Sequence, residues 1–441
     1  MSIDTLNRLR AGQLAGITRL DLSEDLTEFP REIFSLADSL EVLNLSGNRL
    51  SSLPDDLPRL HRLRILFCSD NCFSEVPAVL GDCSELEMVG FKANRIQYLP
   101  ANALPPKLRW LILTDNQLEQ LPDKLGDCHR LQKLMLAGNR LRSLPTTLAN
   151  CRQLELLRIA ANRLPSLPAW LLAMPRLSWL AFAGNPFSDA IEAAALAQHP
   201  VPPIERGHIV LGEVLGQGAS GVIHRAKWQP PAQAGKVMAV KLFKGSLTSD
   251  GLPHSEMAAC IAAGEHPNLI RIAGPLADDG DALPGLLMEL INPSCQVLAS
   301  PPSLASCTRD CYPPQQQFNA EQVLKIASSV ASVMQHIHQR GILHGDLYGH
   351  NLLVDSAGGT LLSDFGAASF HDSLSEESRA LQRLEARAFG YLLEELLERC
   401  EDAVQDARLL RLASLKQQCL LETPRLRPDF DTLVSEMNSI S

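Results

Sequence analysis

Leucine and other apolar residues recur at fixed positions through residues 17–187 of the chain. The pattern Leu-x-x-Leu-x-Leu-x-x-Asn-x-Leu runs from Leu108 to Leu118 and again from Leu131 to Leu141. Its asparagines lie 23, 23, 22, 23, 23 and 23 residues apart, and they are Asn48, Asn71, Asn94, Asn116, Asn139, Asn162 and Asn185. Asp25 lies one further period before them. This spacing predicts one short strand per unit, and stacked units would share a continuous leucine core because one unit cannot bury its leucines alone.

The repeating pattern resembles the leucine-rich-repeat family, in which each unit forms a strand and then turns back. The asparagine is expected to satisfy backbone groups inside the turn, which would explain a polar residue at an inward position. A Leu-Pro pair such as Leu121-Pro122 follows most units, and proline there favours an extended convex side over long helices. The resemblance implies a leucine-rich-repeat solenoid over residues 1–187.

The positions between the strand leucines carry an unusual number of large apolar side chains. Strand alternation is expected to place them on the concave face of the solenoid. The apolar members of this set are Val42, Phe67, Met88, Trp110, Ile112, Met135, Leu156 and Trp179. An apolar patch of this kind is typical of a contact surface. The sequence leaves two occupants open in equal measure, a partner protein or the second domain of the same chain.

The repeat pattern stops at Phe187, and a different composition follows in residues 188–206. The first part of this segment predicts a short helix, which the prolines at 200, 202 and 203 would end. We therefore assign residues 188–206 to a cap and a fairly stiff linker, and residues 207–441 to a second domain.

Residues 207–243 predict three strands joined by tight turns. The first turn contains Gly216, Gly218 and Gly221, and glycine lets a backbone approach phosphate groups without side-chain obstruction. Dinucleotide-binding folds share this glycine spacing, but in those folds a helix follows. Here a second strand follows, and then the sequence Met238-Ala239-Val240-Lys241.

Further motifs come after these strands in a fixed order. Ser255-Glu256-Met257 begins a helical stretch, Leu287-Met288-Glu289-Leu290 has the character of a strand, and residues 320–340 carry apolar residues at helical spacing. His344-Gly345-Asp346-Leu347-Tyr348-Gly349-His350-Asn351 comes next, and Asp364-Phe365-Gly366 begins thirteen residues after Asn351. Together these ordered elements resemble the protein-kinase family over about residues 207–438.

The resemblance implies a site for ATP and Mg²⁺. Lys241 would hold the α- and β-phosphates and pair with Glu256, Asn351 and Asp364 would hold Mg²⁺, and Asp346 would orient the acceptor hydroxyl and receive its proton. Glu265 is the alternative partner for Lys241, but the distance to His266-Pro267 favours Glu256. The implied nucleotide contacts are Leu215, Gly216, Gly218, Gly221, Ile223, Ala239, Lys241, Met288, Glu289, Ile291 and Leu353, with Met288 at the gatekeeper position.

The chain departs from the family pattern around the implied catalytic aspartate. Gly345 replaces the usual arginine that receives an activation-segment phosphate, and Tyr348 replaces a lysine that helps to neutralise the γ-phosphate. Only 20 residues separate Asp364 from Glu385, which occupies the place of an aspartate at the start of the next large helix. The segment that normally docks a substrate peptide is therefore short. Arg427-Pro428 matches a late motif whose glutamate partner is absent.

Residues 292–319 form a segment that contains Cys295, Cys307 and Cys311. Three cysteines could begin a zinc site, but no fourth ligand is evident. A disordered or packed insert beyond the hinge is therefore favoured over a zinc site.

Composition narrows the cellular setting. The formal charge of −10 disfavours a nucleic-acid binder, which would show a basic surface. The sequence shows no signal-peptide pattern and no apolar stretch near the ~20 residues needed to cross a bilayer. The 11 cysteines are then expected to be reduced thiols, and the predicted location is cytoplasmic.

These observations predict an α/β multidomain chain, a leucine-rich-repeat solenoid followed by a bilobal protein-kinase fold of the α+β type. The predicted function is an ATP-dependent protein kinase that modifies serine or threonine, with itself among the substrates. The rival is a pseudokinase scaffold whose repeats bind a partner, and the short docking segment also leaves a small-molecule acceptor open.

Overall fold

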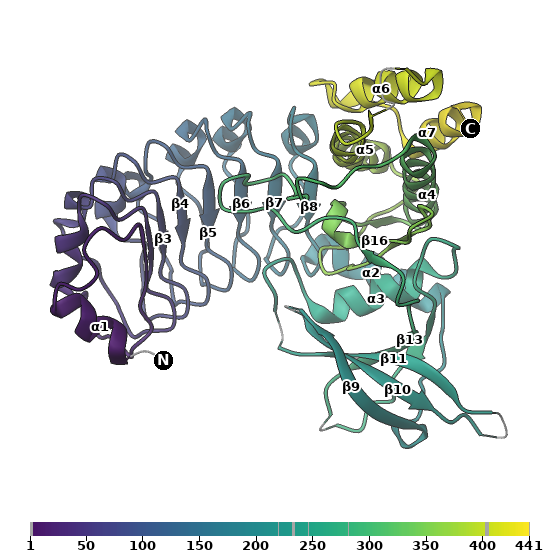
Figure 1. The fold of residues 1–441 in the computed structure, drawn as a ribbon, viewed down its shortest axis with the longest axis horizontal. Helices are drawn as coiled ribbons and strands as arrows, with labels where there is room; N and C mark the ends of the chain where they lie inside the picture. The colour runs from purple at the N-terminus through teal and green to yellow at the C-terminus, as the bar shows by residue number, and fades with distance from the viewer. Residues whose placement is uncertain are drawn as a thin grey trace. The chain divides into compact units, whose positions relative to one another are not determined.

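The computed structural model describes residues 3–218, 220–231, 234–245, 247–280, 282–401 and 405–440. The chain divides into two compact units, residues 1–174 and residues 175–441, called here the repeat unit and the second unit (Figure 1). The boundaries predicted at residues 187 and 207 follow the repeat pattern and stay a prediction. The compact units divide earlier, so the last strand of the repeat series belongs to the second unit.

The repeat unit contains a parallel sheet whose strands follow one another in chain order. Neighbouring strands pair residue for residue, as Trp110 pairs with Lys133 and Leu111 with Leu134. The strands are β1 (Arg19–Asp21), β2 (Val42–Asn44), β3 (Ile65–Phe67), β4 (Met88–Gly90), β5 (Trp110–Ile112), β6 (Lys133–Met135) and β7 (Leu156–Arg158). The middle residue of each of these strands is buried, which confirms the inward position of the repeat leucines. Helix α1 (Ile3–Arg10) precedes the first strand.

The recurring asparagines satisfy backbone groups, as the sequence predicts. The Asn139 amide nitrogen donates to the carbonyls of Leu113 and Leu136, both at 2.9 Å, and its oxygen accepts from the Leu118 amide at 3.0 Å. Asn162 repeats the arrangement one unit later. Each asparagine therefore joins two successive units through their main chains.

The convex side consists of short 3₁₀ turns and contains no long helices in the described repeats. Proline lies directly before most of these turns, where its fixed φ suits the entry and its missing N–H costs nothing. The turns are η1 (Arg31–Leu36), η2 (Leu57–Arg59), η3 (Ala78–Asp82), η4 (Ala101–Ala103), η5 (Asp123–Asp127), η6 (Thr146–Asn150) and η7 (Ala169–Ala173).

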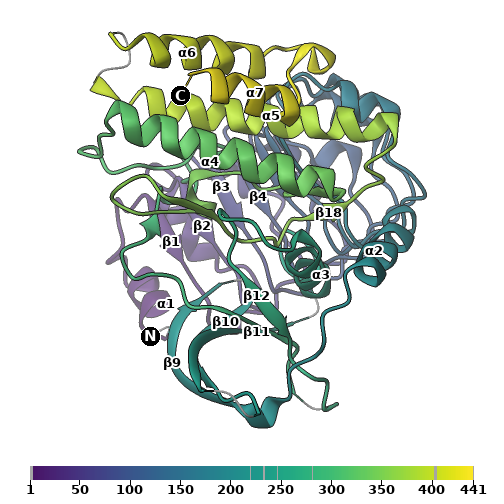
Figure 2. The ribbon, with the colours of Figure 1, turned by 90° about the vertical axis from the view of Figure 1, so that its right-hand side faces the viewer.

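The second unit begins with strand β8 (Trp179–Ala181) and helix α2 (Pro186–Gln198). Asn185 caps α2 together with Ser188 in a reciprocal capping box, so the last repeat asparagine starts a helix. The short helix predicted after Phe187 is thus present and begins one residue before it. Helix α2 lies beside α3 (Pro253–Ala263) in Figure 2.

A five-stranded antiparallel sheet follows, with the order β12-β13-β11-β10-β9. Residues of β11 alternate between two small cores, Val240 with Leu287 on one face and Ala239 with Leu286 on the other. The strands are β9 (Ile209–Gln217), β10 (Gly221–Trp228), β11 (Lys236–Phe243), β12 (Ile272–Pro275) and β13 (Gly285–Glu289). The three strands predicted for residues 207–243 are confirmed.

Helices dominate the rest of the second unit (Figure 2). They are α4 (Ala320–Gln339), α5 (Glu376–Leu397), α6 (Ala407–Cys419) and α7 (Phe430–Ile440). The predicted start of a large helix at Glu385 is wrong, because Ser375 caps α5 by accepting from the Ser378 amide. Short strands complete the unit, and they are β14 (Gln296–Val297), β15 (Ile342–Leu343), β16 (Leu352–Val354), β17 (Thr360–Leu362) and β18 (Ser369–Phe370). The 3₁₀ turns described in this unit are η8 (Arg206–His208), η9 (Gly349–Asn351) and η11 (Pro424–Leu426).

The eight repeat-strand residues predicted to form a contact surface are less exposed to solvent than a surface patch would be. Val42, Phe67, Trp110 and Ile112 are half-buried, and the others are buried. Within the repeat unit, the Trp110 indole lies 3.3 Å from the Met135 sulfur. Trp179 requires a correction, because it is only 1% exposed and is buried inside the second unit.

The helices that the structure describes include none with the length and apolar character of a membrane span.

Candidate active site

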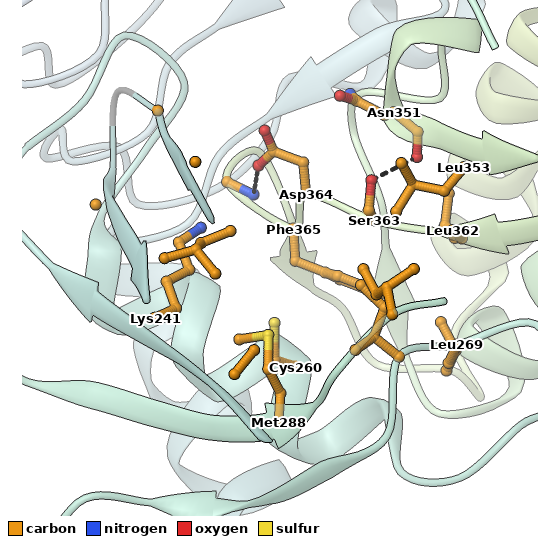
Figure 3. A pocket seen from close by; sticks show the side chains of 18 of the residues that line it. Lys241, Cys260, Leu269, Met288, Asn351, Leu353, Leu362, Ser363, Asp364 and Phe365 are labelled. Atoms are coloured by element: carbon orange, nitrogen blue, oxygen red, sulfur yellow. Dashed lines mark hydrogen bonds between the residues drawn. The ribbon is translucent and has the colours of Figure 1, made fainter. Parts of the chain in front are cut away.

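A cavity of about 640 Å³ lies in the second unit between the five-stranded sheet and the residues around Asn351 and Asp364. All eleven residues predicted to contact a nucleotide line it, from Leu215 on β9 to Leu353 on β16. Four of the five predicted catalytic residues line it as well, namely Lys241, Glu256, Asn351 and Asp364. The fold therefore brings together residues that lie far apart in the sequence (Figure 3).

The glycine-rich turn joins β9 to β10 and forms one wall of the cavity. A side chain at Gly221 would place its Cβ 2.3 Å from the Leu242 carbonyl oxygen, so the sheet requires glycine there. Gly216 and Gly218 have open space where a Cβ would point. Ala219, between them and Gly221, lies outside the described residues.

Lys241 on β11 forms an ion pair with Glu256 on α3. Glu256 is buried and the Lys241 side chain is 15% exposed. Burial by itself would lower the pKa of Lys241, but the carboxylates of Glu256 and Asp364 outweigh burial and raise it. Lys241 thus keeps a positive charge inside the cavity. Its ion-pair partner is Glu256 and not Glu265, which pairs with Arg271.

Asn351 and Asp364 line the same cavity as this ion pair, and Asp346 is hydrogen-bonded to Asn351. Asn351 donates its amide nitrogen to the Asp346 carboxylate and to the Asp346 carbonyl, both at 2.8 Å. The Asn351 amide oxygen then stays available as a ligand for a hard cation. Asp364 has a positive φ of 54° and accepts from the Gly366 amide at 3.1 Å, while its side chain is exposed to the cavity. Asp346 does not line the cavity itself and joins the site through Asn351.

Glu385 of α5 is hydrogen-bonded to the backbone of the segment that carries Asp346. The Glu385 carboxylate accepts from the backbone amides of His344 and Gly345, at 3.2 and 2.5 Å, and from the His338 ring at 2.6 Å. Burial would raise the pKa of Glu385, but the hydrogen bond from His338 and the other partners outweigh burial and lower it. Glu385 therefore holds the backbone on the N-terminal side of Asp346, although it lies nine residues inside its helix.

Sequence comparisons agree with this geometry. Residues 209–400 match the family described as protein tyrosine and serine/threonine kinase, and residues 106–164 and 39–60 match leucine-rich repeat families.

The chain carries leucine-rich repeats and a protein kinase domain.

The similar proteins include a growth factor receptor and several protein kinases. Fibroblast growth factor receptor 1 of Xenopus laevis is 26% identical over 203 residues, which are 43% of this chain and 24% of the receptor. A probable serine/threonine-protein kinase of Dictyostelium discoideum is 28% identical over 222 residues, which are 49% of this chain and 14% of that kinase. CBL-interacting protein kinase 22 of Oryza sativa subsp. japonica is 26% identical over 205 residues, 43% of this chain and 42% of its own length. The chain thus spans less than half the length of each of these relatives.

The kinase domain also contains site residues that the sequence reasoning missed. His350 lines the cavity, and its ring lies 2.8 Å from the buried carboxylate of Asp310 and 3.9 Å from that of Asp346. Asp310 also accepts from the His350 backbone amide at 3.0 Å. Asp310 belongs to the segment 292–319, which is packed against the domain, and no local pattern in the sequence indicates its partner. A group of three or more metal-binding His, Cys, Asp or Glu side chains is not found among the described residues.

Arg427 is hydrogen-bonded to backbone carbonyls instead of to the glutamate that the sequence lacks. Its side chain is 2% exposed, and it donates to the backbone carbonyls of Leu421, Arg383 and Pro175. Burial and the neighbouring Arg387 lower the pKa of Arg427 to about 9. Carbonyl oxygens thus take the place of a carboxylate, which sequence reasoning about side-chain partners could not reveal.

Proposed function

We propose that the protein is an ATP-dependent protein kinase that transfers a phosphate group to serine or threonine hydroxyls of proteins, itself included. The observation that carries this proposal is the Lys241–Glu256 ion pair in a cavity that Asn351 and Asp364 also line. Phosphoryl transfer depends on positioning and on neutralising the charge of the phosphates, and these are the groups that do so.

Each residue has a role that its surroundings support. Lys241 would bind the α- and β-phosphates with the charge that its carboxylate neighbours stabilise. Asp364 and the Asn351 amide oxygen would hold Mg²⁺. The bound ion would neutralise negative charge on the phosphates. Asp346 would orient the acceptor hydroxyl and accept its proton, with its carboxylate fixed by Asn351.

Transfer from labelled ATP with Mg²⁺ to the protein itself and to casein tests the proposal. We expect Asp364→Asn to lower transfer by at least about a thousandfold, since it removes a metal ligand. Asp278→Asn, a change in an exposed loop, should leave transfer unchanged. No transfer by the wild-type protein would contradict the proposal.

A scaffold function is the second candidate, because Tyr348 is buried where related kinases carry a lysine. In that case the repeats would bind a protein partner and the second unit would bind nucleotide without transfer. ATP would then raise the melting temperature of the wild-type protein but leave no labelled phosphate on any protein. The same thermal measurement with Lys241→Met controls for binding in the cavity.

A further inference from the structure

The last repeat strand is in direct contact with the segment that carries Asp346, and both belong to the second unit. The Trp179 indole N–H of β8 donates to the Leu347 carbonyl at 2.9 Å. The Trp179 ring stacks on Tyr348, with ring centroids 4.2 Å apart and planes 7° from parallel. All three side chains are at most 5% exposed. The two residues after Asp346 are therefore held by one tryptophan.

The residue before Asp346 faces the same strand. Gly345 has a φ of +74°, and a Cβ there would lie 2.9 Å from the Leu180 carbonyl of β8 and 2.5 Å from the Ala367 carbonyl. An arginine at this position would collide with both. Gly345 and Tyr348 are the two residues that depart from the kinase pattern around Asp346, and β8 accounts for each of them.

The same part of the chain also holds the short segment after Asp364. The backbone amides of Phe182 and Ala183, directly after β8, donate to the Ser369 hydroxyl at 2.8 and 3.2 Å. Ser369 lies in β18, which pairs with β15 just before His344. The region from Trp179 to Ala183 thus contacts the chain on both sides of the candidate active site.

We propose that Trp179 is a positioning residue for phosphoryl transfer: its indole N–H and ring hold Leu347 and Tyr348, and through them fix Asp346. This inference rests on the proposed kinase function. In this arrangement the last repeat strand takes over the structural task that an arginine–phosphate contact performs in switched kinases, and Asp346 is held in place without a phosphorylated segment.

The indole N–H and the indole ring make separable contributions. Leu347 is 1% exposed, so its carbonyl loses its partner and gains no water when the indole donor is removed. Phenylalanine at position 179 keeps an aromatic ring against Tyr348 but cannot donate. Alanine removes both the donor and the ring.

The test compares full-length Trp179→Phe and Trp179→Ala with the wild-type protein. We expect Trp179→Phe to lower kcat for transfer by about tenfold, the effect of losing one buried hydrogen bond, and Trp179→Ala to lower it further. KM for ATP should stay within about twofold, because the nucleotide contacts lie elsewhere. Trp170→Phe, the same substitution outside the second unit, is the matched control and should change neither constant.

Amide hydrogen exchange provides a readout that does not depend on activity. In Trp179→Phe the amides of residues 344–351 should exchange faster than in the wild type, while those of α4 should not change. Unchanged kcat with unchanged exchange would overturn the inference, and so would a uniform rise in exchange across the whole unit, which indicates general destabilisation. If the wild-type protein transfers no phosphate, the proposed function fails. The exchange data would then decide by themselves whether Trp179 holds this segment.

Discussion

In the repeat unit, a buried asparagine recurs along the repeats and binds main-chain groups. In the kinase domain, a single buried glutamate, Glu385, binds the main chain just before Asp346. Asn139 and Asn162 each bind backbone groups of two successive units with a neutral amide. Glu385 also binds backbone amides, but it is charged and shares its carboxylate with His338. Both kinds of residue are buried. Both give buried main-chain groups the hydrogen-bond partners that water would otherwise provide.

The difference has consequences for stability. A neutral amide is insensitive to pH and its loss is local, because a repeat contacts mainly its neighbours. Removing a buried carboxylate that binds several elements lowers the free energy of unfolding by more. Its protonation also makes that free energy depend on pH. The kinase domain should therefore be the unit that responds more strongly to single changes and to acid.

Removal of Glu385 should have the largest effect. We expect Glu385→Ala to lower the free energy of unfolding of the second unit by about 4 kcal/mol, because it leaves His338 and two backbone amides without their acceptor. Urea denaturation combined with hydrogen exchange of peptides from each unit measures this loss. Glu398→Ala, an exposed position at the end of the same helix, should change stability by less than about 0.5 kcal/mol. A loss spread equally over both units would contradict the comparison.

Acid should weaken the kinase domain through His371. Burial, together with the neighbouring His338, lowers the pKa of His371 to about 4, while Glu385 and Asp372 act in the opposite direction. The unfolded chain takes up this proton near pH 6.5 and the folded chain only near pH 4. Stability is therefore present above about pH 6.5 and is lost as the pH falls from there to about 4, by roughly 3 kcal/mol in total.

Unfolding of His371→Gln across this pH range tests that contribution. The variant should lose the part of the acid slope that belongs to the second unit, whatever its stability at neutral pH. His129→Gln changes an exposed histidine of the repeat unit and should keep the wild-type slope. An unaltered slope in His371→Gln would show that another group is responsible.

The contrast between the units also explains what could be predicted. Strands β1 to β7 and the inward asparagines lie where the spacing predicts, and the eleven predicted nucleotide contacts line the cavity, although Asp346 does not. The partners of Trp179, Asp310 and Arg427 could not be predicted, because each of these residues binds a backbone group 40 or more positions away. The motif identifies Glu385, but the start of α5 depends on a cap at Ser375 that the motif does not include.

Loss of one repeat asparagine should cost less than loss of Glu385. We expect Asn139→Ala to destabilise the repeat unit by about 2 kcal/mol, because two carbonyls and one amide lose a buried partner but no charge is exposed. Asn139→Asp should be at least as damaging, since a carboxylate cannot donate to the carbonyls of Leu113 and Leu136. Hydrogen exchange of repeat-unit peptides gives the measurement, and Asn150→Ala at an exposed position is the control. An effect as large as that of Glu385→Ala would remove the distinction between the units.

The smallest effect is expected at Asp310, where the kinase domain uses a charge that a neutral amide can partly replace. The amide oxygen introduced by Asp310→Asn could still accept from the His350 backbone amide, so this substitution should cost only about 1 kcal/mol. The loss is limited further because burial and the neighbouring Asp310 together raise the pKa of Glu395 to about 7, and removing the Asp310 charge relieves that repulsion. Urea denaturation of Asp310→Asn beside Asp278→Asn measures the difference. A loss above about 3 kcal/mol would mean that the segment 292–319 depends on a charged Asp310 as strongly as the Asp346 segment depends on Glu385.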